Sequence, residues 1–126
     1  MKLSDSEWTV MKVVWDGSCA SARDVFERVA AETNWAYTTV KTTLDRLVEK
    51  GALRVRKQAN RSLYEPLVSR TQARRSALHY MLDKAFDGAF GSLLQHMVAT
   101  EKLTKRDRES LAALLAEMEQ KPKEDA

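Results

Sequence analysis

Residues 35–66 read WAYTTVKTTLDRLVEKGALRVRKQANRSLYEP, and this stretch decides the fold of the chain. Its first half predicts a helix over 37–50, because apolar residues recur there at the spacing of one buried helical face. Gly51 is expected to stop that helix in a left-handed conformation, which glycine adopts at little steric cost. The expected buried face consists of Val40, Leu44, Leu47 and Val48.

A short basic hairpin is expected directly after the glycine. Residues 52–56 and 62–64 alternate between apolar and polar types, as half-buried strands do. A turn over 58–61 would join them, with Asn60 as the residue best able to take a positive φ. Pro66 would close the hairpin, because it cannot donate to the ladder. This order predicts a winged helix-turn-helix, with one helix for the major groove and a β-wing beside it.

Capping patterns ahead of this helix predict two more helices. Ser4 and Glu7 form a capping box before an apolar helical pattern, and Ser21 with Asp24 begins the next helix. Together with the hairpin they make residues 1–68 a unit of three helices and two strands. The fold class is therefore mainly α with a small β-hairpin.

Residues 69–119 are expected to be a helical dimerisation region that starts at the capping Ser69, followed by a polar tail over 120–126. Three helices are expected in this region. Their apolar stripes favour self-association over the alternative, folding back on the N-terminal unit, because one reading helix rarely supplies enough DNA affinity by itself. The residues expected to form the dimer are Leu78, Met81, Leu82, Phe86, Leu93, Leu94, Met97, Leu111, Leu114 and Leu115.

Charge distribution favours a polyanionic partner. The 126-residue chain carries a net charge of +3, but residues 36–61 hold seven basic side chains against two acidic ones, a local charge of +5. The single cysteine, Cys19, excludes an intrachain disulfide and a cysteine metal cluster. The sequence shows neither a signal peptide nor a membrane-spanning apolar run, so a cytoplasmic protein without membrane insertion is expected.

The face of helix 37–50 opposite the apolar stripe is the expected DNA-reading surface. The four threonines of this helix argue against an idle solvated face, since β-branched residues are poor choices for one. Hydroxyl and basic groups can bind phosphates and base edges. The residues predicted to contact DNA are Tyr37, Thr38, Thr39, Lys41, Thr42 and Arg46 in this helix, Arg23 in the preceding helix, and Lys57 and Arg61 beside the turn. For Arg54 and Arg56, phosphate contact and protection of an exposed strand edge stay equal alternatives.

The sequence gives little support for catalytic or metal-binding chemistry. No nucleophile, glycine-rich loop or paired carboxylates suggest an enzyme, and no cofactor is expected. Trp8, Trp15 and Trp35 are expected in the core, and His79 and His96 lack a second ligand at metal spacing. The alternative function is a winged-helix protein–protein interaction module, although the threonine-rich face lacks the large anchors of protein hot spots.

The chain resembles the BlaI/MecI/CopY family of bacterial winged-helix repressors over residues 3–115. The residues that carry the resemblance are Ser6-Glu7-Trp8, Val10-Met11, Trp15, Trp35, Thr39-Val40-Lys41-Thr42, Arg46-Leu47, Lys50-Gly51, Tyr64, Pro66-Leu67-Val68-Ser69, Phe86-Asp87-Gly88 and Ser92-Leu93-Leu94. The resemblance implies a homodimer that binds a palindromic double-stranded operator and blocks transcription. It also implies DNA contacts from Thr38, Thr39, Lys41, Thr42 and Arg46, and a dimer formed by residues 69–118.

Four departures from the family pattern stand out. Ala36 replaces the usual capping residue before the reading helix, and Thr43 stands where a bulky apolar residue is common. The C-terminal region has no cysteine, so copper sensing through a C-terminal cysteine pair is excluded. The branch that responds to β-lactams is inactivated by a membrane-bound sensor protease at an Asn-Phe bond, and His96 and Met97 stand at the matching positions.

Overall fold

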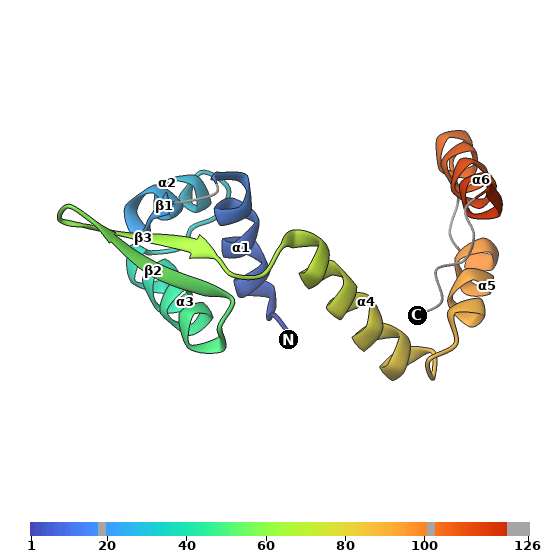
Figure 1. The fold of residues 1–126 in the computed structure, drawn as a ribbon, viewed down its shortest axis with the longest axis horizontal. Helices are drawn as coiled ribbons and strands as arrows, with labels where there is room; N and C mark the ends of the chain where they lie inside the picture. The colour runs from blue at the N-terminus through green and yellow to red at the C-terminus, as the bar shows by residue number, and fades with distance from the viewer. Residues whose placement is uncertain (18–19, 101–102, 121–126) are drawn as a thin grey trace. The chain divides into compact units, whose positions relative to one another are not determined.

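The computed structural model describes residues 1–17, 20–100 and 103–120 and divides into two compact units, Met1–Met81 and Leu82–Ala126. The first unit contains α1 (Asp5–Gly17), α2 (Ala22–Ala30), α3 (Tyr37–Lys50) and a small antiparallel sheet (Figure 1). The predicted winged helix-turn-helix is confirmed. The division between the units falls inside α4 (Arg70–Ala85), beyond the start of that helix.

The sheet has three strands rather than the two expected. β2 (Leu53–Gln58) and β3 (Arg61–Pro66) form the predicted hairpin, and β1 (Ala20–Ser21) pairs with the other edge of β3 in the order β1-β3-β2. A strand of two residues is too short to leave a periodic pattern in the sequence.

The hairpin turn departs from the expectation in one detail. Ala59, not Asn60, takes the positive φ, at 55°. Gln58 pairs directly with Arg61, so the turn has two central residues, and the positive φ falls on the first of them, as in a type II′ turn. The register therefore assigns the left-handed position to the residue less suited to it.

Local capping positions the helices as predicted. The capping boxes of Ser4 with Glu7 and of Ser21 with Asp24 are both present. Gly51 ends α3 with φ of 84°, and its N–H donates to Leu47 and Val48. Ala36 precedes α3 without a side-chain cap, so the start of α3 lacks the hydrogen bond that a capping side chain would supply.

The core of the first unit is built on the apolar face of α3. Val40, Leu44 and Leu47 are fully buried, while Val48 packs at the edge of the core. All three tryptophans pack against this core as predicted, and they stay partly exposed. Trp15 also donates its Nε1–H to the backbone carbonyl of Val68, at 3.0 Å, which attaches the segment after the sheet to α1.

An ion pair joins α1 to the C-terminal end of α3. The side chain of Glu7 is buried and accepts a hydrogen bond from Lys50 Nζ at 2.5 Å, and its Oε1 also accepts from the backbone N–H of Ser4. Burial alone would raise the pKa of Glu7, but the bonds from Lys50 and Ser4 hold it below its ordinary value of 4.5. Glu7 therefore caps one helix and anchors another.

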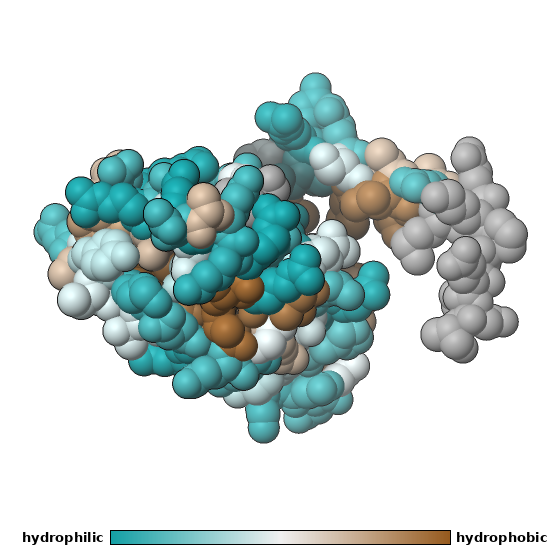
Figure 2. Space-filling view, turned by 60° about the vertical axis from the view of Figure 1, so that its left-hand side comes forward, coloured by the Kyte–Doolittle hydropathy of each residue, from teal (hydrophilic) through white to brown (hydrophobic). Residues whose placement is uncertain are grey.

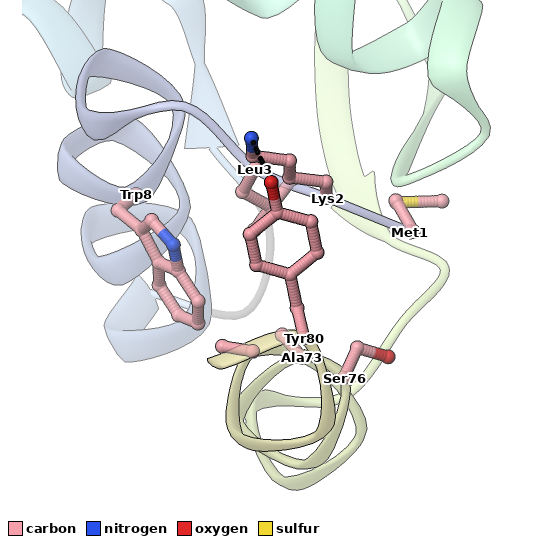
Figure 3. Close-up of a pocket in the computed structure, with 8 residues that line it drawn as sticks. Met1, Lys2, Leu3, Trp8, Ala73, Ser76 and Tyr80 are labelled. Atoms are coloured by element: carbon pink, nitrogen blue, oxygen red, sulfur yellow. Dashed lines mark hydrogen bonds between the residues drawn. The ribbon is translucent and has the colours of Figure 1, made fainter. Parts of the chain in front are cut away.

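The N-terminal segment packs against the first turns of α4. A cavity of about 230 Å³ lies between them, lined mainly by apolar side chains that include Leu3, Trp8 and Ala73 (Figure 3). Lys2 Nζ donates to the Tyr80 hydroxyl at 3.0 Å across it. This contact and a capping box of Ser69 with Gln72 fix the start of α4 on the first unit.

The second unit contains the end of α4, α5 (Phe90–Thr100) and α6 (Lys105–Gln120). Gly88 follows α4 with φ of 78°, and its N–H donates to Leu82. A capping box of Thr104 with Asp107 starts α6. Apolar surface stays exposed among hydrophilic residues (Figure 2), and the largest exposed apolar residues of this unit are Phe90, Leu94, Met97, Val98, Leu111, Leu114 and Leu115.

We expect Glu7→Gln to lower the free energy of unfolding by about 1–3 kcal/mol at neutral pH, because a buried charged hydrogen bond to Lys50 is weakened. The folded-state pKa of Glu7 lies below 4.5, so its contribution is complete above that pH and is lost as pH falls through the folded-state pKa. The difference between the two proteins should therefore shrink on acidification. Urea unfolding at several pH values measures this.

Glu49→Gln is the matched control, because Glu49 is an exposed acid on α3. Its unfolding free energy should stay within about 0.5 kcal/mol of the parent. Equal stability of Glu7→Gln and Glu49→Gln at neutral pH would contradict a stabilising role for the Glu7–Lys50 pair.

Candidate nucleic-acid interface

The outer face of α3 forms a continuous polar arc. Thr38, Thr42 and Asp45 succeed one another at spacings of one helical turn, and Thr39 and Arg46 lie along one side. All five are exposed, because the opposite face of the helix carries the buried apolar stripe. The structure therefore turns hydroxyl, acidic and basic groups outward together, which suits hydrogen bonding to base edges and phosphates.

Lys41 differs from its neighbours because it is already bonded. Its Nζ donates to Asp45 Oδ1 at 2.7 Å and to the hydroxyl of Tyr64 at 2.9 Å. These two hydrogen bonds raise the pKa of Lys41 above its ordinary value of 10.5, so the ammonium stays charged. Tyr64 lies on β3 and is almost fully buried, so Lys41 ties the reading helix to the wing.

A groove of about 470 Å³ opens beside α3 where α2 begins and β3 runs past. It collects four of the predicted DNA-contacting residues, Arg23, Tyr37, Lys41 and Arg61. The amino-terminal end of α2 opens into it with the Ser21 cap. Positive side chains beside a helix N-terminus can receive a phosphate group.

Both arginines that line this groove have acidic partners. Arg61 pairs with Asp24 at 3.1 Å, and Arg23 pairs with Glu27 at 3.4 Å on the surface of α2. Hydrogen bonds from Ser21, together with Arg61, hold the pKa of Asp24 below its ordinary value. The acids orient the guanidinium groups but also compete with phosphate for them.

The basic residues of β2 differ in whether they form ion pairs. Lys57 is exposed near the tip and makes no ion pair with the described residues. Arg54 and Arg56 both pair with Glu65 on the neighbouring strand, at 3.4 and 3.0 Å. These pairs stabilise the hairpin across its strands, so Lys57 is the cation of the wing most available to a polyanion.

Several site residues were missed by reasoning from the sequence. Tyr64 was expected as a strand residue, but it also positions Lys41, and the pairing of Asp24 with Arg61 was not expected. Both contacts join residues far apart in sequence and depend on the register of the sheet. Thr43 is buried, and its hydroxyl donates to the carbonyl of Thr39, which satisfies its polar group at an otherwise apolar position.

The part of the chain that the structure describes contains neither a candidate metal centre nor a candidate membrane span. No group of three potential ligands there could hold a metal ion, and none of its helices is long and apolar enough to cross a bilayer. His96 instead packs edge-to-face on Phe86, with ring centroids 6.0 Å apart. Cys19 lies outside the described residues.

The fold and the polar arc define a winged-helix transcriptional regulator. The penicillinase repressor family model matches residues 3–117, and the chain belongs to this family of repressors, which are not enzymes. The resemblance to the BlaI/MecI/CopY family is confirmed.

Similar proteins agree with this assignment along almost the whole chain. The methicillin resistance regulatory protein MecI of Staphylococcus aureus (strain N315) is 28% identical over 114 residues, which cover 90% of this chain and 93% of MecI. The penicillinase repressor of Bacillus licheniformis is 27% identical over 123 residues, which cover 98% of this chain and 96% of that protein.

A solved structure of a related DNA-binding protein is similar to the winged-helix part of this chain. The solution structure of the Bacillus licheniformis BlaI monomeric form in complex with the blaP half-operator matches with a TM-score of 0.52 and 32% identity. The match covers 57% of this chain and 88% of that one. It shows that a chain with this fold binds DNA.

Proposed function

We propose that the protein is a homodimeric repressor that binds a palindromic operator, with α3 in the major groove and the β2–β3 wing beside it. The observation that carries this proposal is the arc of Thr38, Thr39, Thr42 and Arg46, exposed on a helix whose other face is locked in the core. The half-operator complex of the related BlaI supports the use of this fold for DNA.

The roles of the predicted residues follow from their placement. Thr38, Thr42 and Arg46 read base edges, because they lie on the outermost part of the arc. Tyr37, Arg23 and Arg61 meet the phosphate backbone at the groove beside the start of α2. Lys57 meets a phosphate from the wing. These contacts fix the register of the helix before any base is read.

Self-association supplies the second half-site in this proposal. Seven of the ten residues expected at the dimer interface are exposed, while Phe86 and Leu93 are half-buried and Leu82 is buried. The last three are therefore expected to support the interface from within their own chain. Exposed apolar side chains on α5 and α6 are costly in water and suit a two-fold interface.

Release from DNA by a membrane-bound sensor protease stays a prediction from the family resemblance. His96 and Met97 lie inside α5, which ends at Thr100, so cutting between them requires that helix to open locally. The Asn-Phe pair of the β-lactam-responsive branch is absent from these positions.

The proposal is tested by binding the full chain to its own upstream region in a gel shift, with excess random duplex as competitor, for the parent and for Arg46→Ala. We expect the parent to retain one fragment. Arg46→Ala should lose about 1–3 kcal/mol of operator affinity and relax the preference at one base pair in each half-site. Loss of the parent complex to random competitor at the same concentration as the operator would refute sequence-specific repression.

Lys57→Ala should weaken binding to operator and random duplex alike, because a phosphate contact carries no base information. The slope of log affinity against log salt should fall by about 1 in magnitude. Fluorescence anisotropy over a salt series measures both quantities. A changed base preference would instead mean that the wing reads sequence.

Leu114→Asp should disrupt the dimer, because it places a carboxylate at an exposed apolar position of α6. Sedimentation velocity should show a shift towards monomer, and operator affinity should fall with it. Ala113→Asp introduces the same charge on the other side of α6 and should stay dimeric. A dimeric Leu114→Asp protein would place the interface elsewhere.

A further inference from the structure

The polar arc of α3 contains one acid, Asp45, on the side of the helix that faces the wing. Asp45 lies one turn after both Lys41 and Thr42 and two turns after Thr38, and its side chain is 56% exposed. A carboxylate that enters the major groove approaches a polyanion and gains nothing from phosphates. On a surface that enters the major groove, a hydrogen-bond donor on the DNA can offset this repulsion.

The structure holds this carboxylate in place. Asp45 Oδ1 accepts from Lys41 Nζ at 2.7 Å and lies 3.4 Å from the hydroxyl of Tyr64, which is itself buried on β3. Oδ2 takes no hydrogen bond from the described part of the chain. The ammonium of Lys41 offsets part of the charge repulsion, while one carboxylate oxygen keeps its capacity to accept.

Major-groove chemistry limits what Asp45 can accept from. Only the amino groups of cytosine and adenine donate there, whereas guanine and thymine present acceptor oxygens. Adenine places its N7 acceptor next to its amino group, which repels a carboxylate, and cytosine has no acceptor at the corresponding place. Cytosine is therefore the base that a carboxylate on this arc favours.

We propose that Asp45 is a specificity-determining residue that selects cytosine at one base pair of each half-site, with Lys41 and Tyr64 as its positioning residues. The inference rests on the proposed function, because it assumes that α3 enters the major groove. Asp45 acts largely by excluding the wrong bases. A guanine or thymine at that position places an acceptor oxygen against the carboxylate, so that both acceptors at the interface lack a donor.

The test is selection of operator sequences from random duplexes by the full-length parent, Asp45→Asn, Asp45→Ala and Glu49→Gln, followed by sequencing. Asparagine keeps the size of the side chain but can accept from the adenine amino group and donate to N7. We expect the parent to select cytosine at one position per half-site and Asp45→Asn to select adenine there. The cytosine-to-adenine ratio should change by about tenfold or more.

The other variants separate base selection from charge. Asp45→Ala should lose the preference at that position without gaining one for adenine. Glu49→Gln removes the same charge one turn further along α3 and should keep the cytosine preference. Unchanged profiles for Asp45→Asn and Asp45→Ala, with uniformly tighter binding, would overturn the inference and reduce Asp45 to a source of repulsion.

The same experiment separates a failure of the role of Asp45 from a failure of the proposed operator binding. A parent that selects a palindromic sequence, with the profile unaffected by either Asp45 variant, overturns the role of Asp45 alone. A parent that enriches no sequence overturns the proposed operator binding, and the inference falls with it.

Discussion

The burial of one apolar stripe on α3 is the constraint on which the rest of the structure depends. Val40, Leu44 and Leu47 lose all contact with water, and each side chain contributes about 1.5–3 kcal/mol by that burial. A rotation of the helix by a single residue would bring this stripe into solvent and carry the threonines into the core. Burial of the stripe therefore determines which side chains α3 exposes to solvent, independently of the contacts that the polar arc makes.

Two local features then fix where α3 stops. Gly51 ends the helix in a conformation that strains any other residue, and Lys50 beside it is held by buried Glu7. The chain turns directly into β2 at Leu53, so the wing starts from a fixed point. The contact of Lys41 with Tyr64 joins α3 to β3, the other strand of the wing, nearly three turns before Gly51. Helix and wing consequently behave as one surface.

Local patterns let the sequence predict the helices, their caps and the hairpin. Three kinds of pattern carry this information: serine caps with an acid three residues later, a glycine after a lysine, and an apolar stripe of about two and a half turns. Each depends on residues close together in the sequence. β1 was missed because its two residues form a strand only by pairing with β3. Asn60 was wrongly given the positive φ of the turn because the register, which assigns it to Ala59, is set by the whole hairpin.

The candidate interface was predicted in its residue types but not in its internal bonds. The exposed threonines follow from helical periodicity alone. The bond of Lys41 to Tyr64 and the pairing of Arg61 and the two wing arginines with acids require the sheet register. The sequence pattern also did not predict that Leu82, Phe86 and Leu93 pack within their own chain. Periodicity identifies apolar positions, but it does not show which part of the protein covers them.

The pairing of these cations with acids has a kinetic consequence. A cation that already pairs with a carboxylate must exchange that carboxylate for a phosphate, so its net gain from the contact is smaller than that of an unpaired cation. In the proposed operator binding, random stretches of chromosome offer only this exchange, whereas the operator also satisfies the threonines, Arg46 and Asp45. Complexes with random DNA would then dissociate faster than the operator complex, which would shorten the search for the operator.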